Sequence, residues 1–284
     1  MKNFIWLVSY PKSGNTWFRI FLANYLKDSK APLPLDEIKS TPISSNAIDF
    51  EEETGLNPFE LSISEVENYR PDFYRSLSLN AADDSIFKKT HDAYTYNTNG
   101  HPIFPEDISQ CAVYFVRNPL DVCVSYANHA ASKIEKTVDF MLNQNSRAGG
   151  YKGGQLGQRL LSWDLHYKSW NEQKAIHIHT VRYEDMIGKP METFGSIVKF
   201  LQMEYDEERL ARAIINSDFK LLQKMENEKG FKERLQHCEQ FFWKGSIGNY
   251  KNHLTQDQID RIVNNFHDVM LQLGYIDSKG ILTV

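Results

Sequence analysis

The stretch from Phe4 to Trp17, FIWLVSYPKSGNTW, decides the fold. Its first part, Phe4–Val8, is an uninterrupted apolar run, which predicts a short strand buried on both faces. Gly14 then allows the chain to turn, and the apolar spacing from Thr16 to about Lys27 predicts a buried helix. The chain therefore begins with a strand, a glycine-containing loop and a helix.

This order of elements predicts an anion-binding site. The first amides of a helix point outward and the helix dipole favours negative charge at that end. Lys12 adds a cation to the loop, and Ser13 and Thr16 add hydroxyl donors. The common nucleoside triphosphate loop is Gly-x-x-x-x-Gly-Lys-Ser/Thr, whereas here the lysine precedes the glycine by two positions and no Gly-Lys-Ser/Thr occurs in the chain. We therefore expect a phosphate loop of a different class.

The remaining pattern alternates strands and helices, which predicts an α/β fold: a single domain over residues 1–284 with a central parallel sheet flanked by helices, and a P-loop-like phosphate-binding loop after the first strand. Further strands are expected at 85–89, 111–116 and 176–182, and helices at 16–27, 119–131, 158–173, 191–201, 207–225 and 256–273. Residues 30–84 and 133–157 are expected to be variable insertions on the substrate side. The glycines at 145–157 predict a mobile loop that could serve as a lid.

Composition excludes several classes of protein. The 284 residues are 41% hydrophobic with a net charge of −5, which argues against nucleic-acid binding driven by overall charge. No apolar run approaches the ~20 residues of a membrane span, and the early first strand leaves no room for a signal peptide. Three cysteines without Cys-x-x-Cys pairing, and histidines without ligand spacing, predict neither disulfides nor a metal site. We expect a soluble cytoplasmic protein.

The Tyr10–Trp17 segment resembles the 5′-phosphosulfate loop of the sulfotransferases that use 3′-phosphoadenosine 5′-phosphosulfate (PAPS). A second segment, Val116–Ser125, resembles the family's 3′-phosphate site, in which an arginine and a serine eight residues apart hold the phosphate; here these are Arg117 and Ser125. Arg117 ends a parallel strand, at the edge where open α/β sheets bind ligands, and its guanidinium suits a phosphate dianion. The alternative is that Arg117 simply pairs with Asp121.

Phe87–His91 resembles the family's Lys-Thr-His segment, which supplies the general base. The resemblance implies that His91 takes the proton of the acceptor, because an imidazole with a pKa of ~6.5 is largely neutral near pH 7. Lys89 would place a cation near the sulfuryl group, and Lys12 would neutralise charge on the departing nucleotide. The predicted catalytic residues are therefore His91, Lys12 and Lys89. A lone histidine after a strand can also be structural.

Residues 241–252 resemble the family's C-terminal Arg-Lys-Gly-x-x-Gly-Asp-Trp-Lys-Asn segment, with Trp243 standing where the family usually has arginine. Two further segments, Arg182–Asp185 and Ser217–Phe219, resemble parts of the family that contact adenine, for which core packing is the alternative. The resemblance implies a cofactor-binding set of Lys12, Ser13, Gly14, Asn15, Thr16, Trp17, Arg117, Ser125, Tyr183, Ser217, Phe219, Lys244 and Gly245.

Four motifs in the family's order, over residues 4–255, identify the chain as a PAPS-dependent sulfotransferase, with departures typical of bacterial members. The resemblance implies transfer of the sulfuryl group, without a metal, to a hydroxyl, amine or amide nitrogen of a small-molecule or natural-product acceptor, leaving 3′,5′-adenosine bisphosphate (PAP). The acidic insertion, with Phe50, Phe59, Tyr69, Phe73 and Tyr74, suggests a cationic or amphipathic acceptor. The alternative function is a P-loop kinase that uses ATP. A homodimer stays open, because the family's C-terminal dimer motif is not recognisable at 254–263.

Overall fold

The structure is a computed structural model that describes residues 2–82, 85–150, 154–235, 238 and 240–284. The chain divides into two compact units that are interleaved in sequence. Unit one comprises residues 1–10, 41–114 and 144–180, and unit two comprises residues 11–40, 115–143 and 181–284. The expectation of one domain over 1–284 stays a prediction.

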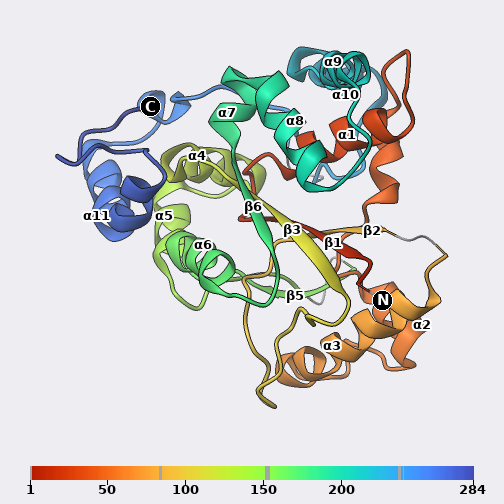
Figure 1. The fold of residues 1–284 in the computed structure, drawn as a ribbon. Coiled ribbons are helices and arrows are strands. Elements are labelled where there is room, and N and C mark those ends of the chain that lie inside the picture. Colours follow the sequence, from red (N-terminus) through yellow and green to blue (C-terminus); the bar gives the residue numbers. More distant parts are fainter. Residues whose placement is uncertain (1, 83–84, 151–153, 236–237, 239) are drawn as a thin grey trace. The chain divides into compact units, whose positions relative to one another are not determined.

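Unit one contains the sheet for most of its length, a small hairpin and the helices that accompany them (Figure 1). Its elements are β1 (Phe4–Ser9), α2 (Ala47–Thr54), α3 (Ile63–Asn80), β2 (Ile86–Thr90), β3 (Ser109–Val116), β4 (Arg147–Gly150), β5 (Gln155–Arg159), α6 (Trp163–Glu172) and β6 (Ile178–Arg182).

The central sheet has the strand order β2-β1-β3-β6. β1 and β2 pair in parallel, with Leu7 opposite Lys89 and Val8 opposite Thr90. Every residue of β1 is buried, as expected for a strand covered on both faces. The predicted α/β fold with a central parallel sheet is confirmed.

The glycine-rich segment differs from its prediction. Residues 145–157 were expected to form a mobile loop, but Arg147–Gly150 and Gln155–Arg159 pair as antiparallel strands. Glycine at 149 and 150 adopts positive φ, which fits the irregular register between the two strands. Residues 151–153 lie outside the described residues, so the lid stays a prediction. The helix expected from residue 158 starts only at Trp163, because β5 occupies 155–159 and Ser162 is the N-cap.

The insertion at 30–84 contains a long helix, because α3 is 18 residues long and begins with a capping box between Ser62 and Glu65. Phe50, Phe73 and Tyr74 pack together in the core of unit one. Because they are buried, these three rings are not available to contact a substrate, contrary to the sequence-based expectation for the insertion.

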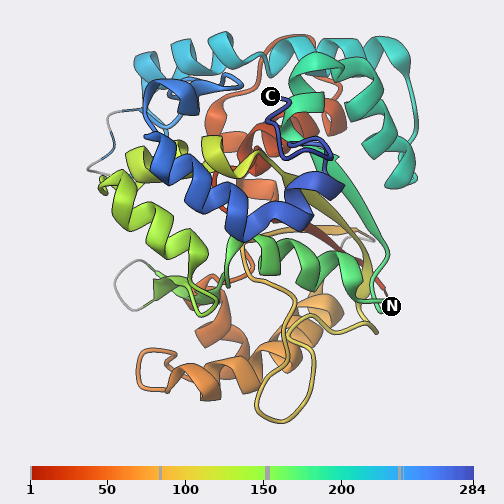
Figure 2. The same cartoon turned by 90° about the vertical axis from the view of Figure 1, so that its left-hand side faces the viewer.

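Unit two begins with the loop that follows β1 and is built from helices. In Figure 1, α9 (Glu207–Asn216) lies beside α1 (Asn15–Leu26). In Figure 2, α11 (Gln256–Gln272) packs against α4 (Pro119–His129) and α5 (Ile134–Leu142). Its elements are α1 (Asn15–Leu26), η1 (Leu35–Ser40), α4 (Pro119–His129), α5 (Ile134–Leu142), α7 (Tyr183–Gly188), α8 (Pro190–Phe200), α9 (Glu207–Asn216), α10 (Phe219–Lys229), η2 (Asn249–Asn252) and α11 (Gln256–Gln272).

The helices expected near 16–27, 119–131, 191–201 and 256–273 are confirmed to within a few residues. The helix expected over 207–225 is two helices. The break falls at Ser217 and Asp218, where the Asp218 carboxylate accepts hydrogen bonds from the amides of Lys220 and Leu221 and caps α10.

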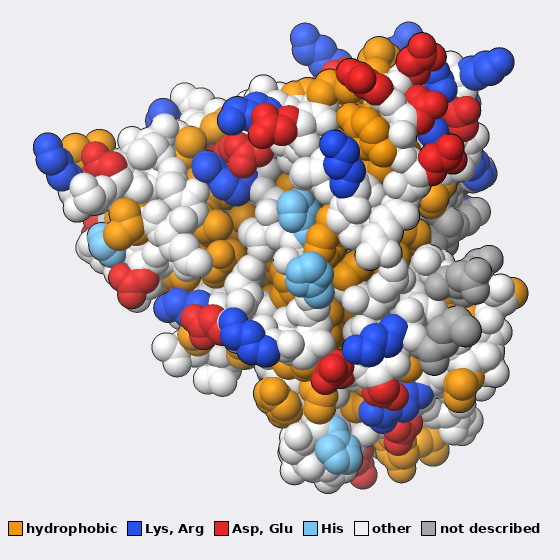
Figure 3. All heavy atoms as spheres, in the orientation of Figure 1, with side chains coloured by type: hydrophobic (Ala, Val, Ile, Leu, Met, Phe, Trp, Pro, Cys, Tyr) orange, Lys and Arg blue, Asp and Glu red, His pale blue; other side chains and the backbone are white. Residues whose placement is uncertain are grey.

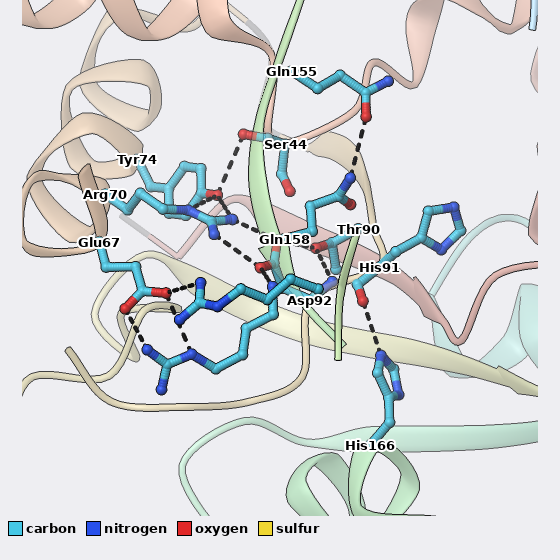
Figure 4. A network of polar contacts seen from close by, with 12 residues as sticks. Ser44, Glu67, Arg70, Tyr74, Thr90, His91, Asp92, Gln155, Gln158 and His166 are labelled. Atoms are coloured by element: carbon cyan, nitrogen blue, oxygen red, sulfur yellow. Dashed lines mark hydrogen bonds and ion pairs between the residues drawn. The ribbon is translucent and has the colours of Figure 1, made fainter. Parts of the chain in front are cut away.

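A buried charge pair ties α3 to the segment after β2. The guanidinium of Arg70 donates two hydrogen bonds to Asp92, of 2.9 and 2.7 Å, and a third of 2.6 Å to the hydroxyl of Tyr74 (Figure 4). Arg70 and Asp92 are almost fully buried. Either charge alone would be costly in the interior, so each of the two side chains depends on the other.

We therefore expect Arg70→Met to lower the free energy of unfolding by about 3–5 kcal/mol, since it leaves the Asp92 carboxylate buried without its cation. Arg75→Met is the matched control: Arg75 pairs with Asp107 at 2.9 Å, but both side chains are substantially exposed, and a loss of about 0–1 kcal/mol is expected. Urea unfolding followed by circular dichroism measures both. Equal losses for the two variants would contradict the role of burial.

Candidate active site

The end of β2 places two lysines on opposite faces of the strand. Lys88 is buried, lies 3.5 Å from the carboxylate of Asp49, and has its pKa lowered by burial. Alternation along the strand sends the Lys89 side chain to the other face. Two main-chain hydrogen bonds hold Lys89: its amide donates to the carbonyl of Pro42 at 3.0 Å, and its carbonyl accepts from the amide of Ser44 at 2.8 Å. Lys88 is therefore the lysine that pairs with Asp49, and Lys89 lies on the face away from that pair.

His91 follows β2 and is oriented by the end of β1. Its Nδ1 lies 2.8 Å from the carbonyl oxygen of Ser9 and 3.2 Å from the Ser9 hydroxyl. A carbonyl oxygen can only accept, so Nδ1 carries the hydrogen. In the neutral ring the lone pair is then on Nε2, which makes Nε2 the basic nitrogen.

The main chain of His91 is held from a second direction. The Nε2 of His166, on α6, lies 3.0 Å from the carbonyl oxygen of His91, and its Nδ1 lies 2.7 Å from the hydroxyl of Tyr114, on β3. Figure 4 shows the His91 imidazole pointing away from the His166 ring that contacts its carbonyl. Sequence reasoning missed His166; its only signal was a histidine one helical turn before Trp170.

In unit two the loop after β1 has the backbone of an anion cradle. Lys12 and Gly14 adopt φ of 71° and 99°, and α1 begins at Asn15 without a side-chain cap and without an acidic residue in its first turn. A Cβ added at Gly14 would lie 2.8 Å from the ring of Tyr183, so only glycine allows this close approach. The buried hydroxyl of Ser13 has no hydrogen-bond partner among the described residues.

Arg117 joins this loop to the C-terminal segment. Its guanidinium donates to the carbonyl of Lys12 at 3.4 Å and to that of Ser246 at 3.0 Å, and it lies 4.3 Å from the centroid of the Tyr183 ring. The predicted alternative, an ion pair with Asp121, is only a 4.0 Å contact. The Nε of Arg117 is buried and unpartnered within the described part of the chain. A buried donor of this kind favours a bound anion.

The C-terminal segment is fixed by two carboxylates. Glu226 accepts from the amides of Phe241 and Phe242 at 2.7 and 2.9 Å, and Asp121 accepts from those of Gly248 and Tyr250 at 2.8 and 3.0 Å. These bonds use main-chain donors, so the sequence motif alone did not reveal either acid as a support.

Aromatic rings gather around the same loop. The ring centroids of Trp17 and Tyr183 are 5.8 Å apart, and the Tyr183 hydroxyl donates to the carbonyl of Gly245 at 3.2 Å. Trp17 Nε1 donates to the carbonyl of Ser217 at 2.7 Å. The α-carbon of Gly245 rests on the ring of Phe219, since an added Cβ would come within 2.5 Å of it. These contacts bring together five of the predicted cofactor residues.

Other predicted residues have contacts of their own. Thr16 donates its hydroxyl to Glu233 at 3.2 Å, and the ammonium of Lys12 lies 4.2 Å from the centroid of Phe241. The hydroxyl of Ser217 donates to carbonyls at the end of α9. Lys244 is exposed, and Ser125 lies on α4.

The predicted residues thus fall into two sets. Lys89 and His91 belong to unit one, and the others belong to unit two. Among the described residues no group of three histidine, cysteine or acidic side chains could hold a metal ion. No helix in the described ranges is long and apolar enough to cross a membrane. On the face drawn in Figure 3, basic side chains are interspersed with acidic ones among the described residues.

Residues 2–274 match the sulfotransferase domain family, and the chain therefore belongs to that family. Cytosolic sulfotransferase 13 of Arabidopsis thaliana is 28% identical over 275 residues, covering 90% of this chain and 74% of that protein. Sulfotransferase 1B1 of Mus musculus is 25% identical over 268 residues, covering 90% of this chain and 78% of that protein. The suggested bacterial affiliation stays a prediction.

Two solved structures share the fold. Retinol dehydratase in complex with androsterone and the inactive cofactor PAP has a TM-score of 0.63 at 18% identity, covering 94% of this chain and 80% of that one. Mouse sulfotransferase SULT7A1 complexed with PAP has a TM-score of 0.59 at 20% identity, covering 95% and 84%. The family identified from the sequence motifs is confirmed.

Burial lowers the pKa of His166 to about 4, although the His91 carbonyl and the charge of Asp92 act in the opposite direction; the Tyr10 and Tyr114 rings also pack against it. In the unfolded chain the pKa of this histidine is ~6.5. Between about pH 6.5 and 4, the unfolded chain therefore binds a proton at His166 that the folded protein does not. The free energy of unfolding should therefore keep its full value above about pH 6.5 and decrease as the pH drops toward 4. Protonation of His166 in the unfolded chain should account for up to about 3 kcal/mol of this decrease.

Urea unfolding of the wild-type protein and of His166→Gln at pH 7.5 and 4.5 checks this expectation. The carboxylates titrate in both proteins, so the difference between their pH dependences isolates His166. The wild type should lose more stability on acidification than the variant. Identical pH dependences would show that His166 is not held neutral in the folded state.

Proposed function

We propose that this chain transfers a sulfuryl group from PAPS to a hydroxyl, or to an amine or amide nitrogen, of a small-molecule acceptor. The observation that carries the proposal is a pair of buried donors, Ser13 Oγ and Arg117 Nε, that find no hydrogen-bond partner among the residues the structure describes, in a chain of the sulfotransferase family. Buried polar groups are normally hydrogen-bonded, and phosphate oxygens would satisfy both. The complexes of retinol dehydratase and mouse SULT7A1 with PAP, the nucleotide that PAPS leaves after transfer, support PAPS as the donor.

The residues of unit two fit the two phosphates and the base of the nucleotide. The start of α1, with Lys12, Ser13, Gly14, Asn15 and Thr16, would hold the 5′-phosphate through amides, hydroxyls and an ammonium. Arg117 and Ser125, with Lys244 and the Gly245 amide, would hold the 3′-phosphate. Trp17, Tyr183 and Phe219 would pack against the adenine, and Ser217 would lie beside it.

The residues of unit one fit the proton transfer. PAPS supplies a sulfuryl group on a phosphate leaving group, so that one S–O bond breaks as the bond from sulfur to the acceptor forms. His91 Nε2 takes the acceptor proton, because the hydrogen on Nδ1 is committed to the Ser9 carbonyl. Lys89 stabilises charge on the sulfuryl oxygens, and Lys12 stabilises charge on the departing phosphate. No metal enters this scheme.

The acceptor is proposed only by class. Retinol dehydratase has been solved in complexes with androsterone and with retinol, and a flavonol 3-sulfotransferase of Flaveria bidentis is 26% identical over 288 residues. We therefore propose an acceptor with an apolar body and one nucleophilic group, which includes natural-product scaffolds. A cytosolic location, as in the names of the plant relatives, is part of the proposal.

Nucleotide binding tests the cofactor assignment. PAP should stabilise the protein in a thermal shift assay more than ATP with magnesium does; the reverse order would favour the alternative, a P-loop kinase. Arg117→Ala should weaken PAP about 10- to 100-fold, the value of charge-assisted hydrogen bonds, while AMP, which lacks the 3′-phosphate, loses less. Arg212→Ala, which removes an exposed pair with Asp28, is the control and should leave both affinities unchanged. Equal losses for PAP and AMP would overturn the Arg117 contact.

Turnover tests the role of His91. With labelled PAPS and a library of phenols, alcohols, amines and natural products, mass spectrometry should find a sulfonated product of the wild-type protein. His91→Ala should lower kcat about 10²- to 10⁴-fold, the usual contribution of a general base, with PAP affinity unchanged. His101→Ala, an exposed histidine of the same unit, is the matched control. Full turnover by His91→Ala would remove His91 from the mechanism.

A further inference from the structure

Helix α6 contacts the segment after β2 through several side chains. His166 and Trp170, one helical turn apart, donate ring N–H groups to the carbonyls of two consecutive residues, His91 at 3.0 Å and Asp92 at 2.8 Å. The hydroxyl of Ser169 accepts the amide of Tyr94 at 3.0 Å. This side of α6 thus follows the main chain from residue 91 to 94.

The contact to His91 requires one tautomer of His166. The His91 carbonyl can only accept, so His166 Nε2 must carry the hydrogen and Nδ1 must be an acceptor. Tyr114 supplies the matching donor at 2.7 Å. Both rings are completely or almost completely buried, which keeps the phenol a donor and the imidazole neutral. Two residues of different elements therefore define the direction of the bond to His91.

We propose that His166 is a positioning residue for His91. It anchors the His91 carbonyl so that the imidazole of the same residue reaches the Ser9 carbonyl and presents Nε2 as the base, and Tyr114 fixes the tautomer that makes this possible. The proposal rests on the proposed function for its consequence on turnover, but the geometry at His91 can be measured without turnover.

His91 is then held at two points that oppose each other. Its carbonyl accepts from α6, and its Nδ1 donates to the end of β1 at 2.8 Å. If only the carbonyl or only Nδ1 of His91 were held, the imidazole could still change its orientation. Small misplacements of a reacting group cost up to about 10² in rate, so this double attachment should affect kcat more than the affinity for the nucleotide.

The experiment uses the full chain and three variants of this network. His166→Gln keeps an N–H at the position of Nε2, His166→Leu removes it, and Tyr114→Phe removes only the hydroxyl. Tyr167→Phe is the matched control, since Tyr167 neighbours Tyr114 with ring centroids 5.7 Å apart and makes the same chemical change. Two readouts are taken: kcat and KM with PAPS, and the tautomer of His91 from two-bond ¹⁵N–¹H spectra.

His166→Leu should lower kcat about tenfold or more with little change in KM for PAPS, and should reduce the Nδ1–H form of His91 in the spectra. His166→Gln should recover most of the kcat and most of the Nδ1–H form of His91. Tyr114→Phe should give values between those of His166→Leu and the wild type. Tyr167→Phe should match the wild type. If His166→Leu fails to fold, Tyr114→Phe and His166→Gln decide the matter.

An unchanged His91 tautomer in His166→Leu and Tyr114→Phe would overturn the proposal. Equal losses in His166→Gln and His166→Leu would also overturn it, since they would reduce the role of His166 to filling space. A wild-type protein that transfers no sulfuryl group to any acceptor would instead contradict the proposed function, while the spectra would still test the positioning of His91.

Discussion

The hydrogen bond from His91 Nδ1 to the carbonyl oxygen of Ser9 is the interaction on which the orientation of the His91 imidazole depends. It joins the ends of two neighbouring parallel strands, β2 and β1, immediately before the chain enters the predicted phosphate loop. Because the acceptor is a main-chain carbonyl, it cannot be exchanged by mutation of a side chain and can accept only one tautomer. The tautomer required by the role proposed for His91 is thus the one that the geometry of the sheet favours.

The support of this residue extends through the interior of unit one. Asp92, the next residue, is held by Arg70, and its carbonyl accepts from Trp170. Such fully paired polar groups are tolerated in a core because each donor meets an acceptor, and they fix the main chain more tightly than apolar packing would. Unit two achieves the same result differently, with Glu226 and Asp121 accepting main-chain amides around a segment that carries the predicted phosphate ligands.

Much of this architecture could be predicted from the sequence. The apolar runs at Phe4–Val8 and Cys111–Val116 lie within β1 and β3, and the sequence motifs alone identify the family. The hairpin at 147–159 was not predictable, because glycine-rich composition is shared by loops and irregular strand pairs. The roles of Ser9 and Glu226 were equally invisible, since bonds to or from the main chain leave no signature in residue type. For His166 the sequence shows only that it lies one helical turn before Trp170. Its tautomer depends on Tyr114, 52 residues away, which the sequence does not place beside it.

The contact between Gly245 and Phe219 has a consequence for engineering the proposed nucleotide site. Since the glycine α-carbon rests directly on the aromatic face, these two positions form one steric unit although they are distant in sequence. A library that varies one of them while holding the other constant would sample mostly clashes or voids. A smaller ring at 219 would make room for a methyl group at 245, but Gly245 adopts a φ of 61°, where any side chain is strained. The freedom to vary this contact therefore lies mainly at position 219.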